Sequence, residues 1–403
     1  MRKMKLGMFG RIVIAIAGGV ALGFLFTRCG VAGDVAMRVL KTFNCFFAQI
    51  LKFIVPLLII GLVTPAIADA GKGAGKMLVA VMALSYVSTC AASMFGYLAS
   101  GELLPIYVQK GAVAAAGNGK AFLPYVDLKI PPVCDVLTAL ALAFMVGTGI
   151  VFMKAAALKK VVDDFAEIVK FTITRAIIPG LPVYIMTMIC EMTASGKIGA
   201  MAGTMMKVIG TGWALTIVFL ALMYVAAGAV AGRNPFKCLW NMSPAYLTAL
   251  SIASSSAVIP VTLECCEKNR ISKDVRNFVI PLCANVHMVG SAIKMMASTL
   301  AVVIIFGLDV PFAKFLHFTC MFAIAAVAAP GVMCGVLMAS VGFLESILGL
   351  TSDQIAVMMA FYMALDGYGP AANVTGDGAI ALVADKFFGG ANPEGMHGIG
   401  SRP

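Results

Sequence analysis

Three polar residues, two carboxylates and an amide, interrupt an apolar stretch near the C-terminus. They are Asp366, Asn373 and Asp377, and their spacing of seven and then four residues places them close to one face of a helix. A carboxylate in hydrocarbon is costly and is normally kept where it binds, pairs with or relays something. The pattern therefore predicts a polar stripe facing a substrate or ion path. The alternative is a buried asparagine beside two helix-capping carboxylates.

The composition places the elements that carry this stripe in a membrane. The chain of 403 residues is 61% hydrophobic and 12% charged, with a mean hydropathy of +0.97. Soluble domains are nearer half apolar and a quarter charged. About eight spans of 20-odd residues with short loops would fill this length. We therefore expect an all-α polytopic membrane protein without a separate soluble domain.

The formal charge of +11 is better explained by membrane topology than by nucleic-acid binding, because the basic residues are scattered over loops. A cytoplasmic N-terminus places about twice as many of them inside as outside, which follows the positive-inside rule. We expect the inner (plasma) membrane, with both termini cytoplasmic. The apolar stretch 12–26 is interpreted as a retained first span rather than a signal peptide. The 11 cysteines are interpreted as mostly small buried thiols.

The apolar segments predict eight membrane spans, which are separated by more polar segments. The segment 104–132 is polar, rich in glycine and contains four prolines, so it is expected to be an external loop, and 154–170 is expected to be amphipathic and cytoplasmic. The expected spans are 10–27, 43–66, 77–100, 133–153, 165–192, 207–232, an interrupted seventh at 277–308 and an eighth at 352–385.

Two further stretches, 236–268 and 312–346, each consist of two short apolar arms around a tip of small residues with a proline. Re-entrant hairpins fit the loop charges better than full spans do. Irregular backbone at membrane depth is tolerated where it is buried in protein or lines a cavity. Because hairpin and span then alternate twice, the pattern predicts a transporter with its binding site at the two tips. Two ordinary helical pairs with flexible corners are the alternative.

Three motifs resemble the glutamate-transporter family of dicarboxylate and amino acid:cation symporters, the sodium:dicarboxylate symporters. They are Ser254-Ser255-Ser256 with Pro260-Val261-Thr262, the break at 285–291, and Asn373-Val374-Thr375-Gly376-Asp377. The resemblance implies eight transmembrane helices plus two re-entrant helical hairpins, inverted repeats, an elevator-type mechanism and a homotrimer. It also implies a scaffold at 1–75 and 133–195 and a transport domain at 76–103 and 196–390, with a loop at 104–132 and a cytoplasmic tail at 391–403.

The resemblance also implies the site residues. Asp366 would hold the substrate's amino group and Asn373 its carboxylate, while the two hairpin tips close over the substrate. A sodium ion would bind Asp377 with backbone carbonyls, since hard oxygen ligands suit an alkali cation, and a deeper sodium would use hydroxyls of the third span. The substrate-binding set is Ser254, Ser255, Ser256, Ser291, Val332, Asp366, Gly369 and Asn373, and the cation-binding set is Cys283, His287, Asn373, Asp377, Ser88 and Thr89.

Several positions depart from the family pattern. Val289 and His287 replace the aspartate and asparagine of the seventh-span motif, so the deeper sodium site has lost its carboxylate. Gly369 replaces an arginine, which predicts a larger, uncharged pocket that disfavours aspartate and glutamate. Lys294 could be a fixed cation that substitutes for a lost ion, or a lysine that snorkels to an interface or pairs with a loop acid. His287 could carry a proton near neutral pH, or be neutral and bonded to the break.

These observations predict a secondary active symporter, coupled to sodium or protons, that imports a small and preferably neutral amino acid. A dicarboxylate symporter of the same fold, reading its second carboxylate through Lys294, is the first alternative. An ion channel is the second, although the polar groups converge on the tips rather than forming a continuous stripe. The chain offers no nucleophile–base pair, metal motif or phosphate loop, so we expect neither an enzyme nor a bound cofactor. Membrane lipid is the expected surrounding partner.

Overall fold

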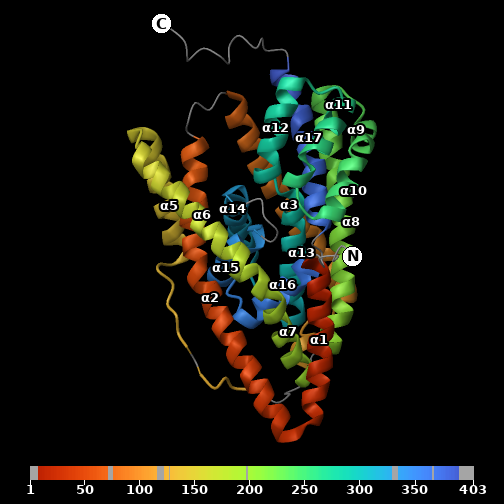
Figure 1. Cartoon of the computed structure of the whole chain (residues 1–403). Coiled ribbons are helices and arrows are strands. Elements are labelled where there is room, and N and C mark those ends of the chain that lie inside the picture. The colour runs from red at the N-terminus through yellow and green to blue at the C-terminus, as the bar shows by residue number, and fades with distance from the viewer. Residues whose placement is uncertain are drawn as a thin grey trace, which may run out of the picture.

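The computed structural model describes residues 8–70, 76–115, 122–126, 128–196, 198–328, 335–364 and 367–389, and every regular element in these ranges is helical. Figure 1 shows long helices that run up and down the molecule and short ones packed among them. The α-helices are α1 (Met8–Arg28), α2 (Gly30–Ala70), α3 (Lys76–Tyr107), α4 (Ala112–Ala115), α5 (Val136–Met153), α6 (Ala156–Thr172), α7 (Ile178–Ala194), α8 (Ile198–Ala231), α9 (Pro235–Asn241), α10 (Ser243–Ile252), α11 (Ile259–Lys268), α12 (Lys273–Val286), α13 (Val289–Phe306), α14 (Phe312–Ala328), α15 (Gly335–Ser346), α16 (Ser352–Ala364) and α17 (Tyr368–Phe388).

The first six expected spans all fall on helices, but several of these helices are longer than expected. Helix α2 has 41 residues and begins 13 positions before the predicted start at 43. The amphipathic segment and the fifth span form one continuous rod, because a π-helical turn, Ile173–Ile177, joins α6 directly to α7. Among the described residues, five helical stretches are long and apolar enough to cross a membrane. The predicted total of eight spans stays a prediction.

Both expected hairpins have two helical arms. In the first, 236–268, α10 and α11 are joined by a turn at Ala253, which has a left-handed φ of 54°, and by a short 3₁₀ turn at Ser256–Val258. In the second, 312–346, the arms are α14 and α15, while the tip lies outside the described residues. The small residues at the first tip therefore mark a chain reversal.

The seventh span is interrupted as predicted. Helix α12 ends at Val286, α13 begins at Val289, and His287 between them has an extended backbone. The eighth span also consists of two helices, α16 and α17, where the aligned stripe predicted one. Asp366 lies outside the described residues, so the structure shows only Asn373 and Asp377 on one helix.

The helices pack in two neighbourhoods. Helix α2 contacts α1, α5, α6 and α7, and α1 lies against α7 over much of its length. Helix α17 contacts α8, α10, α12 and α13, and α3 packs along α13. The second neighbourhood includes the broken seventh helix and the last helix, and so holds the residues of the predicted site. The division into scaffold and transport domains stays a prediction.

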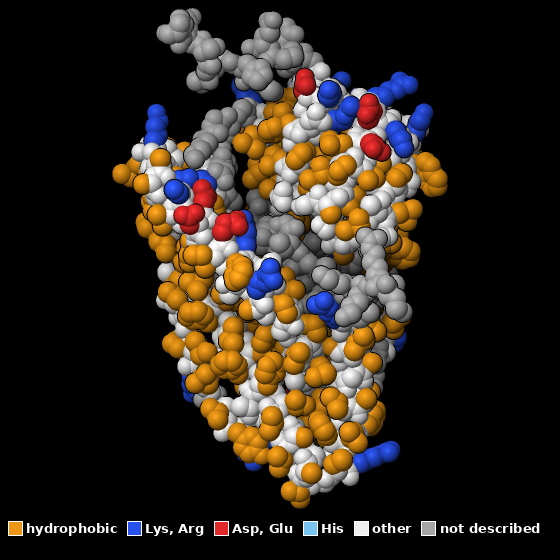
Figure 2. Space-filling model, in the orientation of Figure 1, with side chains coloured by type: hydrophobic (Ala, Val, Ile, Leu, Met, Phe, Trp, Pro, Cys, Tyr) orange, Lys and Arg blue, Asp and Glu red, His pale blue; other side chains and the backbone are white. Residues whose placement is uncertain are grey.

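The surface is suited to a hydrocarbon surrounding. In Figure 2 hydrophobic side chains cover most of the visible body, while lysines, arginines and acids gather toward the upper end. The α1–α2 corner lies at the lower end in Figure 1 and the α11–α12 corner at the upper end. Inside, every residue of α13 from Val289 to Val303 is buried. Helix α13 is therefore enclosed by other helices over most of its length.

Candidate functional site

The core of the site is the place where α13 begins against the middle of α17. A Cβ built on Gly290 would lie 2.5 Å from the Cβ of Ala372 and 2.5 Å from the carbonyl oxygen of Gly369. No larger side chain fits there without displacing backbone, so the glycine lets the two helices touch. This contact holds the start of α13 against the residues that the sequence analysis singled out.

Asn373 joins the two helices. Its Oδ1 accepts hydrogen bonds from the backbone N–H groups of Gly290 at 2.8 Å and Ser291 at 3.3 Å. The first N–H groups of a helix have no partner within the helix, so the amide caps α13 from a different helix. Its Nδ2 is 3.2 Å from Oγ of Ser291 and 3.2 Å from the sulfur of Met288. The amide therefore directs its NH₂ group, a donor, toward Ser291.

His287 and Asp377 form a fully buried pair. Nδ1 of His287 lies 2.9 Å from Oδ1 of Asp377, and both side chains are 0% exposed. Gly376 makes room for the ring, because a Cβ there would come within 2.7 Å of Cε1 of His287. Of the two interpretations of His287, the one that bonded it to the break is wrong, since the ring reaches across to α17.

The carboxylate of Asp377 keeps one oxygen for another partner. Among the described residues, Oδ2 of Asp377 and Nε2 of His287 have no hydrogen-bond partner. A buried carboxylate oxygen of this kind fits a cation such as the expected sodium. The backbone carbonyl of Cys283, a predicted ligand, already accepts the N–H of His287 at 2.9 Å.

Of the two hydroxyl residues predicted for the deeper sodium site, Thr89 reaches the site and Ser88 does not. Thr89 is fully buried, and its Oγ1 lies 3.4 Å from the backbone nitrogen of Met288, at the break between α12 and α13. Ser88 instead donates to the carbonyl of Ser85 on its own helix at 3.1 Å. The buried Val289 stands where the family pattern has an aspartate, so the described residues give Thr89 no acid at that position.

Lys294 and Gly369 lie together beside Ser291, and we call this part of the site the Gly369 wall. A Cβ on Gly369 would lie 3.4 Å from Nζ of Lys294 and 3.5 Å from Oγ of Ser291. The lysine is only 1% exposed, so the snorkelling interpretation is wrong. The expectation of an uncharged space at Gly369 is wrong, because the lysine brings its ammonium there, while the larger pocket stays a prediction. A lysine within an apolar run was a visible signal in the sequence, but the direction of its side chain depended on packing.

The serines of the first hairpin tip lie at the edge of this core. Ser254, Ser255 and Ser256 are half-buried. Oγ of Ser256 is 3.4 Å from Oδ1 of Asn285, near the end of α12. The arm α10 reaches the start of α17, since a Cβ on Gly367 would lie 2.8 Å from the carbonyl of Leu250. The first hairpin therefore lies near the end of α12 and near the start of α17. Val332 and Asp366 lie outside the described residues.

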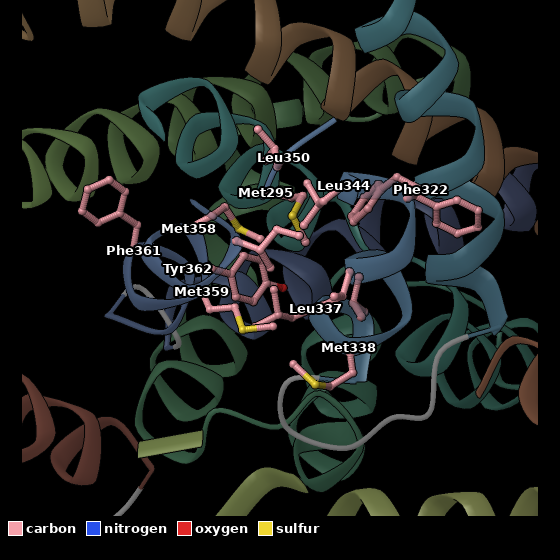
Figure 3. Close-up of a cluster of buried hydrophobic side chains, with 14 of the residues drawn as sticks. Met295, Phe322, Leu337, Met338, Leu344, Leu350, Met358, Met359, Phe361 and Tyr362 are labelled. Atoms are coloured by element: carbon pink, nitrogen blue, oxygen red, sulfur yellow. The ribbon is translucent and has the colours of Figure 1, made fainter. Parts of the chain in front are cut away.

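Two tyrosines contact the site, and neither was predicted from the sequence. The ring of Tyr362, which belongs to a cluster of buried hydrophobic side chains (Figure 3), lies 3.7 Å from Nζ of Lys294, and the hydroxyl of Tyr224 donates to the carbonyl of Thr375 at 2.8 Å. Both tyrosines stand in apolar runs, where nothing in the spacing marks them. A cavity of about 620 Å³ between α2, the segment 129–135 and α15 is lined by none of the predicted site residues, and we do not assign it to the site.

Comparisons with known proteins agree with this geometry. The model of the sodium:dicarboxylate symporter family matches residues 8–387. The chain is 27% identical to the serine/threonine transporter SstT of Streptococcus thermophilus over 404 residues, which cover 95% of this chain and 96% of that protein. It is 31% identical to human excitatory amino acid transporter 3 over 187 residues, 46% of this chain and 35% of that protein. These relatives are transporters and not enzymes, and with a family match over nearly its whole length the chain belongs to the sodium:dicarboxylate symporter family, as its motifs predicted.

Proposed function

We propose that the protein is a cation-coupled symporter that imports a small neutral amino acid. The observation that carries this proposal is the wall at Gly369, where Nζ of Lys294 and Oγ of Ser291 lie in ordinary van der Waals contact with the position of an added Cβ. A substrate side chain directed at this wall would meet these two groups. The likeness to a protein named as a serine/threonine transporter, which extends over both whole chains, supports a small substrate.

Charge balance favours a neutral amino acid over an acidic one. In the proposed site Asp366 holds the substrate's ammonium group, and the described residues bring one ammonium, that of Lys294, to the Gly369 wall. Gly369 stands where the family pattern has an arginine, so position 369 offers no guanidinium to a second carboxylate. An unpaired second carboxylate in a dry pocket costs roughly 3–5 kcal/mol. At about 1.4 kcal/mol per tenfold, neutral amino acids should bind on the order of a hundred times more tightly.

The remaining expectations complete the proposal. Asp377 would bind the coupling cation, sodium or a proton, with carbonyls of Cys283, His287 and Asn373 nearby, and Ser254, Ser255 and Ser256 with Val332 would close over the substrate. The protein would work as a homotrimer in the inner membrane, with both termini cytoplasmic and a transport domain that moves against a scaffold. The family match and the buried carboxylate support sodium as the ion.

Uptake by purified protein in liposomes tests the proposal. Labelled serine should accumulate when a sodium or proton gradient is imposed, and unlabelled alanine, serine and threonine should compete at far lower concentrations than aspartate, glutamate or succinate. Equal competition by the dicarboxylates would show that the neutral preference is wrong and favour the dicarboxylate symporter. Uptake that ignores both gradients would contradict coupled transport.

A further inference from the structure

A surface at the upper end of the molecule in Figure 1 takes no part in the candidate site. Four elements meet there: the end of α8, the short helix α9, the corner between α11 and α12, and the end of α17. The guanidinium of Arg233 donates to the carbonyl of Asn269, and Nδ2 of Asn241 donates to Oδ1 of the same Asn269 at 2.8 Å. The backbone N–H of Ser272 donates to Oδ1 of Asp385 at 2.9 Å. These hydrogen bonds hold the four elements in one surface.

This surface carries more positive charge than its ion pairs neutralise. Arg233 pairs with Asp385 at 2.9 Å, and Arg276 pairs with Glu267 at 3.2 Å. Within residues 232–278 and 385–389, the other charged side chains are exposed and comprise two acids, Glu264 and Asp274, and five bases, Lys237, Lys268, Arg270, Lys273 and Lys386. We call these five bases the basic patch. Five bases against two acids leave an excess of positive charge that an anionic partner can balance.

Large aromatic side chains border the basic patch. Phe236 is 67% exposed, Trp240 is 77% exposed and Phe387 is 69% exposed. Phe236 and Trp240 are four positions apart on α9, so they lie on the same face of that helix. Lys237 directly follows Phe236, and Phe387 directly follows Lys386. A tryptophan exposed beside lysines is typical of the level at which a membrane meets water.

The patch begins where an apolar, outward-facing helix ends. Residues Gly203–Ala231 of α8 form a stretch that is long and apolar enough to cross a membrane. Near its end Leu222 is 54% exposed, and Val225 and Val230 are each 44% exposed. Apolar side chains gathered on an outer surface mark a face that lipid or a partner covers. Because such a helix leads directly into α9, the patch lies at the depth of the lipid headgroups.

We propose that the basic patch binds the headgroups of anionic phospholipids, while the three aromatic side chains enter the boundary between headgroups and acyl chains. Clusters of lysines and arginines next to a membrane span are typical of anionic-lipid recognition, and each such residue near the surface strengthens binding about fivefold. An acidic soluble partner would match the charge, but it would not account for aromatic side chains that continue the apolar surface of α8. The inference does not depend on which solute the protein transports.

Quenching of tryptophan fluorescence by brominated lipids tests the assignment, because the chain has two tryptophans. Trp213→Phe leaves Trp240, beside the patch, as the reporter. Trp240→Phe leaves Trp213, which at 1.5 Å per residue lies roughly 27 Å along α8 from its end at Ala231. Each variant is reconstituted in phosphatidylcholine bilayers that carry brominated phosphatidylglycerol or brominated phosphatidylcholine in both leaflets. The quenching gives the affinity of the anionic lipid relative to the neutral lipid at each reporter.

At low salt the anionic lipid should bind beside Trp240 about fivefold or more tightly than the neutral lipid, and less than about twofold more tightly beside Trp213. Replacing Lys237, Lys268 and Lys273 together by glutamine should bring the Trp240 ratio below about twofold. About 1 M salt should do the same, because it screens charges more than about 3 Å apart. The matched control replaces three exposed lysines outside the patch by glutamine, Lys110, Lys129 and Lys314, and should leave the ratio unchanged.

Equal affinities of the two lipids beside Trp240 would overturn the assignment. So would a preference that the triple patch variant retains or that the control variant also loses, because the charge of the patch would then not be its cause. If Trp213→Phe does not fold, the unaltered protein decides by the same comparison. Quenching by the anionic lipid no stronger than by the neutral lipid at low salt would then refute the proposal.

Discussion

Replacing His287 tests the buried pair that joins the broken seventh helix to α17. In His287→Leu, the carboxylate of Asp377 stays 0% exposed but loses the ring nitrogen that lay 2.9 Å away. Breaking a buried pair by removing one partner costs about 3–5 kcal/mol, whereas replacing both partners by apolar residues is far less costly. We therefore expect the double variant His287→Leu with Asp377→Leu to be more stable than His287→Leu alone.

The measurement is a double-mutant cycle on reversible unfolding in mixed micelles, with choline in place of sodium so that no bound ion contributes. The coupling energy should exceed about 1.5 kcal/mol, the lower value for hydrogen bonds to charged groups. His317→Leu, at an exposed histidine of α14, is the control and should change stability by less than about 0.5 kcal/mol. Losses from the two single variants that add up within about 0.5 kcal/mol would show that the pair does not stabilise the fold.

Three further outcomes follow from the same site. Asp377→Asn should raise the half-saturating sodium concentration of uptake more than Thr89→Ala does, because only Asp377 offers a charge; equal values would remove Asp377 as the coupling ligand. Gly290→Ala should destabilise the protein by about 1–3 kcal/mol in chemical denaturation, since its Cβ would meet Ala372 at 2.5 Å; unchanged stability would contradict the close helix contact. Asp366→Asn should abolish uptake of serine with normal expression, and full uptake would refute its role.

The sequence predicts the fold where a local pattern decides the structure. The interruption of the seventh span and the first hairpin tip carry small residues, prolines and polar groups, and the structure breaks its helices at both places. The lengths of the helices were harder to predict from the sequence, because apolar runs mark only the part of a helix that hydrocarbon surrounds. Polar residues such as Arg38 and Lys41 lie on the same α2 helix as the predicted span, and nothing in them signals a helix end.

The partners within the site could not be predicted from spacing. His287 and Asp377 are 90 positions apart, and the pairing depends on how α12 and α17 pack rather than on either helix alone. The same holds for Lys294, whose direction is set by the contact of α13 with α17 and by the Tyr362 ring. The sequence identified these residues as unusual, but their surroundings follow from tertiary packing.

The close contact between α13 and α17 has a mechanical consequence. Gly290 and Gly376 remove the space between the broken seventh helix and α17, while Asn373 and the His287–Asp377 pair cross-link them. Separating these helices would expose several buried polar groups at once, so we expect them to stay together when other elements move. In the proposed transport cycle, a solute would therefore enter or leave through displacement of other elements rather than through separation of α13 from α17.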